Sequence, residues 1–366
     1  MLSFHSFILG YLGIACHQHL YLLISKFTRL TFMQNYSTEN KMSSSANKLP
    51  INQYFVDASQ LILGTMNLGG GWNNNPISKE DITQAHTLLE HCLSVGINVI
   101  DIADIYTFGK AESVIGEVFE QNRTLREQFI VQSKVGIKLT PTFEVKQYDL
   151  SGRWVTESLN ASLKRLNIDY LDVLFLHRPD PLMQIKPLSE TLSNLHKQDK
   201  FDFLAVSNMH AGQIALIQTH TDIPVIANQL EMSLLHSGFI EDGITTNMHD
   251  NAAFGFPRGT LEYCIQQNVQ LQAWGAMAQG QFTQLDSEDK NIAATAKLIK
   301  PIAEQHDCHA NAIVLAWLMM HPAQIQPVIG STQTERITQA AKSTEIQLTR
   351  EQWYQIFETR RGNEVP

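Results

Sequence analysis

The stretch IDIADIYTFGKAES, residues 100–113, closes an apolar run with Asp101, Asp104 and Tyr106 inside six residues. Aspartate is a poor strand residue, so the carboxylates mark where a buried strand stops and a loop begins. The segment ESVIGEVF that follows is typical of a helix beginning at Glu112. The stretch therefore predicts a strand, a loop at the strand's end and a helix, in that order.

This unit recurs along the chain. Amphipathic stretches such as residues 78–96, with a Ser78 cap, Asp81 three residues on and Gly96 at the end, alternate with short apolar runs. Such alternation implies a parallel sheet with right-handed crossovers. Eight units in about 290 residues predict one α/β domain over residues 49–366, a closed (β/α)8 TIM barrel. Its strands are expected at 61–64, 98–102, 129–135, 171–177, 203–208, 224–229, 269–274 and 325–330.

A doubly wound open sheet is the competing fold. The segment GTMNLGGGWNNN after the first strand lacks a GxGxxG pattern that runs into a helix, which removes the main support for that fold. We expect these glycines to shape a loop at the top of the barrel. The connection over residues 230–258 is too long for a simple turn, and we expect it to reach over the barrel mouth.

Residues 1–48 differ in composition from the rest. An apolar run over residues 4–24 precedes the polar segment NYSTENKMSSSANK, but no Lys or Arg comes before the run, and His17, Gln18 and His19 interrupt it. A targeting segment, a disordered extension, and an over-early start with Met33 or Met42 as the true first residue all stay open. The segment is left out of the predicted fold.

Composition excludes several classes of protein. The 366 residues carry a net charge of −9, which opposes binding to nucleic acid, and 43% are hydrophobic, so we expect no membrane partner. Four cysteines without CxxC spacing suit a reducing compartment, and we expect a cytoplasmic protein. His306, Cys308 and His309 lack a second ligand pair at zinc-finger spacing, so no metal site is expected.

Catalytic groups of a barrel lie at the carboxyl ends of its strands. A phenol such as Tyr106 is a weak acid at neutral pH unless a cation lowers its pKa, and Lys134 can be that cation. A buried lysine needs a carboxylate partner, which Asp101 can supply. His177 can donate to an oxygen on which negative charge develops. Together these groups fit proton donation to a carbonyl oxygen.

The chain resembles the aldo-keto reductase family in six ordered motifs from about Ser59 to the last residue. The segment NVIDIADIYTFGKAE is similar to the family's aspartate and tyrosine strand, VQSKVG to its lysine strand and YLDVLFLHRPD to its histidine strand. LAVSN, ANQLE and GSTQTERITQA resemble its serine-asparagine pair, its glutamine and its cofactor-phosphate segment.

The resemblance implies a role for each matching residue. Tyr106 would be the general acid, Lys134 and Asp101 its tuning pair, and His177 the group that orients the carbonyl. Ser207, Asn208 and Gln229 would bind the nicotinamide carboxamide, and Trp274 would stack on the ring. Ser331 and Arg336 would hold a 2′-phosphate, which favours NADPH over NADH. The other cofactor contacts implied are Thr65, Met66, Gly330 and Gln339.

Some positions depart from the family pattern. Asp199, Asp202 and Ala205 are interpreted as packing variation, whereas WGAMAQG after the seventh strand and Ala340 affect the expected phosphate-loop and adenine contacts. Asp104 belongs to no catalytic role in the family, and we expect it to be solvated. Glu112 is interpreted as an acid in the first turn of a helix, favourable to its dipole.

The sequence is compatible with two functions. The first is an NADPH-dependent enzyme that reduces a small aldehyde or ketone to an alcohol, reversibly, by hydride transfer. The alternative is a non-catalytic or redox-sensing regulatory subunit on the same scaffold. The substrate, the preferred direction and the oligomeric state are not determined by the sequence. The loops near Trp72, 140–150 and 230–258 would set selectivity, and the short tail favours a wide pocket.

Overall fold

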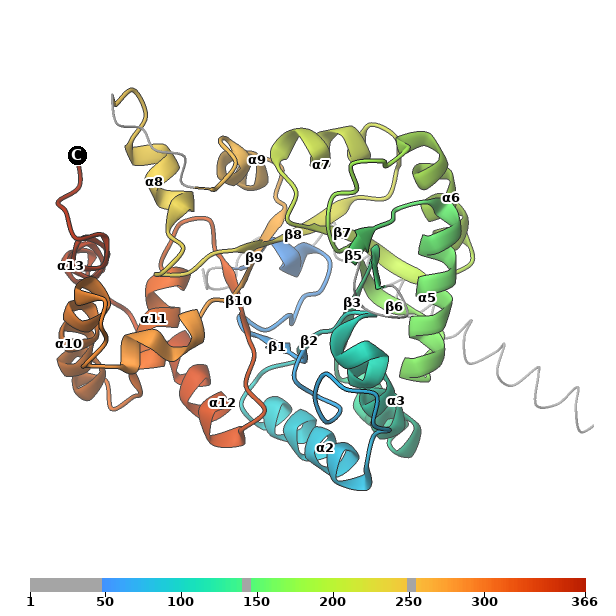
Figure 1. Ribbon diagram of the computed structural model, residues 1–366, viewed down its shortest axis with the longest axis horizontal. Coiled ribbons are helices and arrows are strands. Elements are labelled where there is room, and N and C mark those ends of the chain that lie inside the picture. Colours follow the sequence, from blue (N-terminus) through green and yellow to red (C-terminus); the bar gives the residue numbers. More distant parts are fainter. Residues whose placement is uncertain (1–47, 140–145, 249–254) are drawn as a thin grey trace, which may run out of the picture. The chain divides into compact units, whose positions relative to one another are not determined.

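The computed structural model describes residues 48–139, 146–248 and 255–366 and confirms the predicted barrel. Eight strands, each parallel to its neighbours, close in the order β1-β10-β9-β8-β7-β6-β3-β2 (Figure 1). All eight expected strands are present, with ends that differ by a few residues. They are β1 (Ile62–Gly64), β2 (Val99–Asp101), β3 (Ile130–Val135), β6 (Leu171–Leu176), β7 (Phe201–Ser207), β8 (Val225–Glu231), β9 (Gln270–Trp274) and β10 (Gln326–Ile329).

Helices lie around the outside of the strands (Figure 1). The predicted cap is confirmed, because the Ser78 hydroxyl accepts from the Asp81 backbone N–H at 3.1 Å and Gly96 follows with a φ of 77°. The α-helices are α2 (Lys79–Ser94), α3 (Lys110–Gln121), α4 (Arg123–Glu127), α5 (Gly152–Leu166), α6 (Ile185–Lys197), α7 (Ala211–Gln218), α8 (Gly238–Ile244), α9 (Thr260–Gln266), α10 (Lys290–Gln305), α11 (Ala310–Met319), α12 (Thr334–Ala341) and α13 (Arg350–Arg361). The 3-10 turns are η1 (Pro50–Gln53), η2 (Tyr106–Gly109), η3 (Ala278–Thr283) and η4 (Lys342–Glu345).

The inside of the barrel changes from apolar to polar toward the carboxyl ends of the strands. Side chains alternate between the two faces of a strand, so every second residue points inward. On β3 this inward series is Ile130, Gln132 and Lys134. The lower part is an apolar cluster in which Ile51 of η1 packs against the strands, with Ile62, Val99, Val173, Phe175, Ala205 and Ala227 among its members. On β2, β3 and β7 a polar residue comes last in the inward series, namely Asp101, Lys134 and Ser207, which places these residues toward the mouth. Gln326 is an exception, because it is buried at the start of β10.

Several segments differ from or extend the expectations. An antiparallel hairpin of β4 (Ile137–Leu139) and β5 (Lys146–Tyr148) follows β3, where the sequence indicated only a loop. Gly69, Gly70 and Gly71 all have positive φ, so the predicted glycine loop is confirmed. Asp199, which stands where the family has glycine, has a φ of 57°, a left-handed conformation that Asp tolerates better than most residues.

Some predictions fall on residues outside the described ranges. The separate segment 1–48 lies almost wholly there, as do residues 140–145 and 249–254 of the two predicted selectivity loops. Within the described ranges, no helix is both long enough and apolar enough to cross a membrane.

Candidate active site

The end of β2 and the turn after it carry two of the four predicted catalytic residues. Asp101 is the last residue of β2, and Tyr106 opens η2 five residues later. Thr107 and Phe108 in that turn have φ angles of 46° and 62°, unfavourable for residues other than glycine. The Thr107 hydroxyl bonds to the carbonyl of Leu68 at 2.8 Å and so anchors the turn to the loop after β1. The position of Tyr106 is thereby fixed by backbone geometry.

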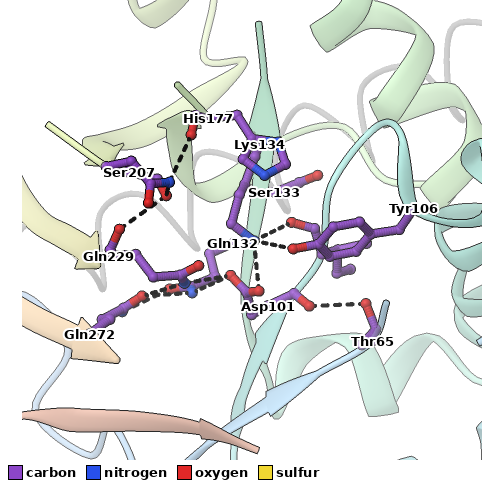
Figure 2. Close-up of polar contacts among 12 residues, drawn as sticks. Thr65, Asp101, Tyr106, Gln132, Ser133, Lys134, His177, Ser207, Gln229 and Gln272 are labelled. Carbon is purple, nitrogen blue, oxygen red and sulfur yellow. Dashed lines mark hydrogen bonds and ion pairs between the residues drawn. The ribbon is translucent and has the colours of Figure 1, made fainter. Parts of the chain in front are cut away.

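Lys134 is fully buried on β3, and its side chain points toward Asp101 and Tyr106 (Figure 2). Its ammonium group has three hydrogens and three acceptors: Asp101 Oδ2 at 2.6 Å, the carbonyl of Ile102 at 3.0 Å and Tyr106 Oη at 3.1 Å. An ammonium group can only donate, so the phenol oxygen accepts this hydrogen bond. The phenolic hydrogen of Tyr106 is therefore available to another acceptor.

Burial and neighbouring charges shift the pKa values of Lys134 and Tyr106 in opposite directions. Burial lowers the pKa of Lys134, but the Asp101 carboxylate and Tyr106 outweigh it and raise the pKa above its ordinary value. The predicted carboxylate partner of the lysine is therefore confirmed, and Lys134 is a cation at neutral pH. For Tyr106 the predicted direction of the pKa shift, a lowering by Lys134, is wrong. Burial raises the pKa of the phenol by more than Lys134 lowers it, and Asp101 and Asp104 raise it further.

An amide network fixes the other oxygen of Asp101 (Figure 2). The amide nitrogens of Gln132 and Gln229 both donate to Asp101 Oδ1, at 2.8 and 2.9 Å, and both also donate to Gln272 Oε1. The Thr65 hydroxyl donates to the backbone carbonyl of Asp101 at 2.9 Å. Both side-chain oxygens of Asp101 are thus held, one by neutral donors and one by Lys134.

His177 follows β6 and is 9% exposed. Its ring lies edge-on to that of Tyr106, with ring centres 6.1 Å apart. Both residues line one cavity of about 1320 Å³. A carbonyl oxygen in this cavity can therefore approach both the phenol and the imidazole.

The predicted nicotinamide contacts lie at the carboxyl ends of β7, β8 and β9. Asn208, with a φ of 58°, accepts from Trp274 Nε1 at 3.1 Å and donates to Ser207 Oγ at 2.7 Å. The Ser207 hydroxyl in turn donates to the Gln229 carbonyl at 3.0 Å. Because the amide of Asn208 bonds to Trp274, it fixes the orientation of the indole at the cavity wall.

The remaining predicted contacts surround the far part of the same cavity, between β10 and α12. Gly330, Ser331, Arg336 and Gln339 line it there, and Thr65 and Met66 line it beside β1. Every predicted site residue except the fully buried Lys134 is among its lining residues. Gln339 also joins α12 to α11, because its carbonyl oxygen accepts from the His309 backbone N–H at 3.2 Å.

Two acids near the site differ from their sequence-based interpretation. Asp104 is half-buried as a residue, but its Oδ1 is shielded from solvent and has no hydrogen-bond partner, so the expectation of a solvated side chain is wrong. Burial raises the pKa of Asp104 to about 7. Glu112 does stand in the first turn of α3, but it is fully buried, pairs with Arg165 at 2.6 Å and accepts from Ser133 at 2.7 Å.

Sequence reasoning missed Gln132, Gln272 and Arg178. Gln132 and Gln272 stand two residues before Lys134 and Trp274 on the same strands, so the inward alternation of the strands was the signal that could have found them. Arg178 is the residue after His177 and lines the cavity. Among the residues with a described structure, no group of three His, Cys, Asp or Glu is arranged to hold a metal ion.

Known proteins match both the chain and its barrel. Residues 60–361 match the model of the Aldo/keto reductase family. The chain is 28% identical over 314 residues to 6-dehydroglucose reductase of Agrobacterium fabrum, covering 85% of this chain and 97% of that protein. It is 29% identical over 289 residues to the oxidoreductase YdhF of Escherichia coli, covering 77% and 89%. An aldo-keto reductase from Klebsiella pneumoniae, solved with NADPH, superposes with a TM-score of 0.63 at 21% identity, covering 84% and 92%.

The match over residues 60–361 and the barrel identify the class of protein. The chain belongs to the aldo/keto reductase family and is an oxidoreductase. Members of this family use NADP(H) as their cofactor.

Proposed function

We propose that the protein reduces an aldehyde or ketone to an alcohol with NADPH, and that Tyr106 is the general acid. The observation that carries this proposal is the contact of the buried Lys134 ammonium with both Asp101 and Tyr106, at 2.6 and 3.1 Å. The contact leaves the phenolic hydrogen available at the cavity that His177 also lines. A purely structural lysine would not need a phenol among its three acceptors.

The tetrad of Asp101, Tyr106, Lys134 and His177 can supply the proton and stabilise the charge that reduction requires. When bound, NADPH would supply the hydride that the carbonyl carbon receives. Tyr106, whose pKa is raised by burial, is protonated at neutral pH and can give its hydrogen to the carbonyl oxygen. The phenolate formed in this step is stabilised by Lys134, whose own charge Asp101 balances. The His177 imidazole would orient the carbonyl oxygen toward the phenol.

The cavity fits the proposed cofactor at both ends. Trp274 presents an oriented indole face near the tetrad, and the carboxamide would bind to Ser207, Asn208 and the free oxygen of the Gln229 amide. At the other end, Arg336 is exposed at the start of α12, and no acid partner of its guanidinium lies within the described ranges. Such a cation suits the 2′-phosphate of NADPH. The relatives named reductase and oxidoreductase agree with this chemistry.

Replacing Tyr106 by phenylalanine tests the proposal. Y106F removes the acidic hydrogen and keeps the ring, so we expect the rate of NADPH oxidation with a panel of aldehydes and ketones to fall about 10²- to 10⁴-fold. NADPH binding, followed by fluorescence titration, should stay within about twofold, since the phenol is not a proposed cofactor contact.

Two results would overturn the proposal. One is a Y106F variant as active as the parent protein. The other is a parent protein that binds NADPH yet turns over no carbonyl compound in the panel, which would favour the regulatory-subunit alternative.

A further inference from the structure

Arg178 occupies the catalytic end of the cavity. It directly follows His177 at the end of β6, is half-buried and lines the same cavity as Tyr106. Its guanidinium carbon lies 5.9 Å from the ring centre of Trp274, so the side chain extends across the cavity wall rather than into solvent. A planar guanidinium placed there can contact a ligand bound beside the tetrad.

The charge of Arg178 has no counter-ion in the described part of the chain. Three of the four other half-buried arginines pair with a carboxylate: Arg126 with Asp172, Arg165 with Glu112 and Arg361 with Glu241. The fourth, Arg360, lies close enough to Asp289 for its charge to lower the pKa of that carboxyl. An arginine removed from water without a partner loses hydration and gains no ion pair in return. A ligand that brings an anionic group would supply the missing interaction.

The acids that line the cavity already have other partners. Asp101 pairs with Lys134 at 2.6 Å, Glu231 with His236 at 3.3 Å, and Asp307 contacts Lys342 at 3.8 Å. Glu335, in the first turn of α12, accepts from the Gln339 amide at 3.1 Å. None of these four carboxylates forms an ion pair with Arg178. The second guanidinium in the cavity, that of Arg336, stands at the opposite end, where the proposed function assigns it to the cofactor phosphate. Binding of the cofactor phosphate therefore accounts for Arg336 but gives Arg178 no partner.

We propose that Arg178 determines specificity by binding an oxyanion, either a carboxylate or a phosphate, that the carbonyl substrate carries near its reactive group. The fork of N–H donors on a guanidinium matches both kinds of oxyanion in bidentate fashion. The substrate class is therefore an acidic aldehyde or ketone. This inference rests on the proposed reductase function, and it places the acidic group of the substrate beside His177.

Matched substrate pairs test this class. Succinic semialdehyde is compared with butanal, and glyceraldehyde 3-phosphate with glyceraldehyde, each with NADPH. In R178Q we expect the ratio of kcat/KM for the acidic to the neutral member to fall about 10- to 100-fold, mainly through KM. R178K, which keeps the charge but lacks the planar fork, should recover part of the ratio. The pair that responds identifies the anionic group as carboxylate or phosphate.

Two control variants separate specificity from general damage. Arg350 also lies over an aromatic ring, that of Tyr354 at 5.3 Å, but it does not line the cavity, so R350Q should leave the ratio unchanged. R336Q should raise KM for NADPH and also leave the ratio unchanged, because it acts at the other end of the cavity. A ratio in R178Q equal to that of the parent protein, for both pairs, would overturn the inference.

A binding measurement keeps this inference distinct from the proposed function. If the parent protein reduces no carbonyl compound in the panel, these four aldehydes included, the proposed function fails. The oxyanion site is then judged by calorimetric titration of the NADP-loaded protein with benzoate and with inorganic phosphate. Binding to the parent protein that is at least about tenfold weaker in R178Q supports the site. Equal affinities in the two proteins, or no binding to the parent protein, refute it.

Discussion

Lys134 shows how one buried residue can organise an active site. Its three hydrogens meet three oxygens, and one of these belongs to the proposed acid Tyr106. An ammonium group with a full set of acceptors stays charged in spite of complete burial, because the Asp101 carboxylate compensates for the lost hydration. The charge is then available to stabilise a phenolate, which no solvent-exposed lysine could do as strongly.

Asp104 gives a pH-dependent prediction at the same scale. The pKa of this carboxyl is about 7 in the folded protein, against an ordinary value of 3.8. Between these values the unfolded chain binds fewer protons than the folded one, so the free energy of unfolding falls as pH rises from about 4 to about 7 and then levels off. In D104N the carboxyl is absent, so its free energy of unfolding should not show this decrease. Its stability relative to the parent protein should rise by up to about 4 kcal/mol across that interval.

Urea unfolding of the two proteins at a series of pH values measures this difference. D286N, which removes an exposed carboxyl, is the matched control and should follow the parent curve. Parallel curves for D104N and the parent protein would show that Asp104 does not hold its proton in the fold.

At the scale of elements, helices α3 and α5 approach each other closely at Gly116. A Cβ atom on this residue would lie 2.0 Å from the backbone carbonyl oxygen of Arg165 on α5. The same two helices are joined by the ion pair between Glu112 and Arg165. The glycine and the ion pair together set the spacing of α3, the helix that follows the Tyr106 turn.

We predict that G116A destabilises the protein. Alanine favours helix by about 1 kcal/mol over glycine, but separating two packed backbones costs more, and we expect a net loss of about 3 kcal/mol. G243A in α8 is the control, because no atom lies within 4 Å of the added methyl group, and it should be neutral or stabilising. Urea unfolding measures the free energies of unfolding of G116A and G243A. Equal values for the two variants would mean that α3 can shift away from α5 without loss of stability.

At the scale of the whole barrel, an amide network connects its base with its catalytic end. The Gln326 amide donates to the Ser59 carbonyl at 2.6 Å, Gln272 donates to Gln326 and Gln132, and Gln132 donates to Asp101. All three glutamines are fully buried. Since Asp101 as a carboxylate can only accept, its charge determines which way each amide in the network points.

We predict that Q272L damages both stability and catalysis. The substitution removes four hydrogen bonds. The side-chain oxygens of Gln132 and Gln326 lose their donor, and Gln132 and Gln229 each lose one of the two acceptors of their amide nitrogen, at a cost of about 2 to 4 kcal/mol. We also expect kcat to fall roughly 10- to 100-fold, because Asp101 loses its fixed position. Urea unfolding and NADPH oxidation measure the two effects. Q53L, at the exposed Gln53, is the control and should change neither quantity. An unchanged kcat in Q272L would mean that the amide network has only a structural role.

The sequence alone was sufficient to predict the barrel and to place Asp101, Lys134 and His177 at the ends of its strands. Alternating strands and helices are local patterns, and residues such as Asp101 and Lys134 can be placed at strand ends because parallel strands of a barrel all end at one mouth. The cap at Ser78 is likewise local, since a hydroxyl three residues from its N–H partner needs no distant contact.

The tertiary structure decided what depends on distant neighbours. Whether Asp104 is solvated, and whether the pKa of Tyr106 moves up or down, depends on burial by segments far away in the sequence. The amide network joins residues up to 267 positions apart, and the lack of an ion-pair partner for Arg178 among the described residues is visible only once the acids that line the cavity have been placed. Desolvation and pairing of charge are properties of the assembled site, which is why local patterns predicted the candidate catalytic residues but not their state.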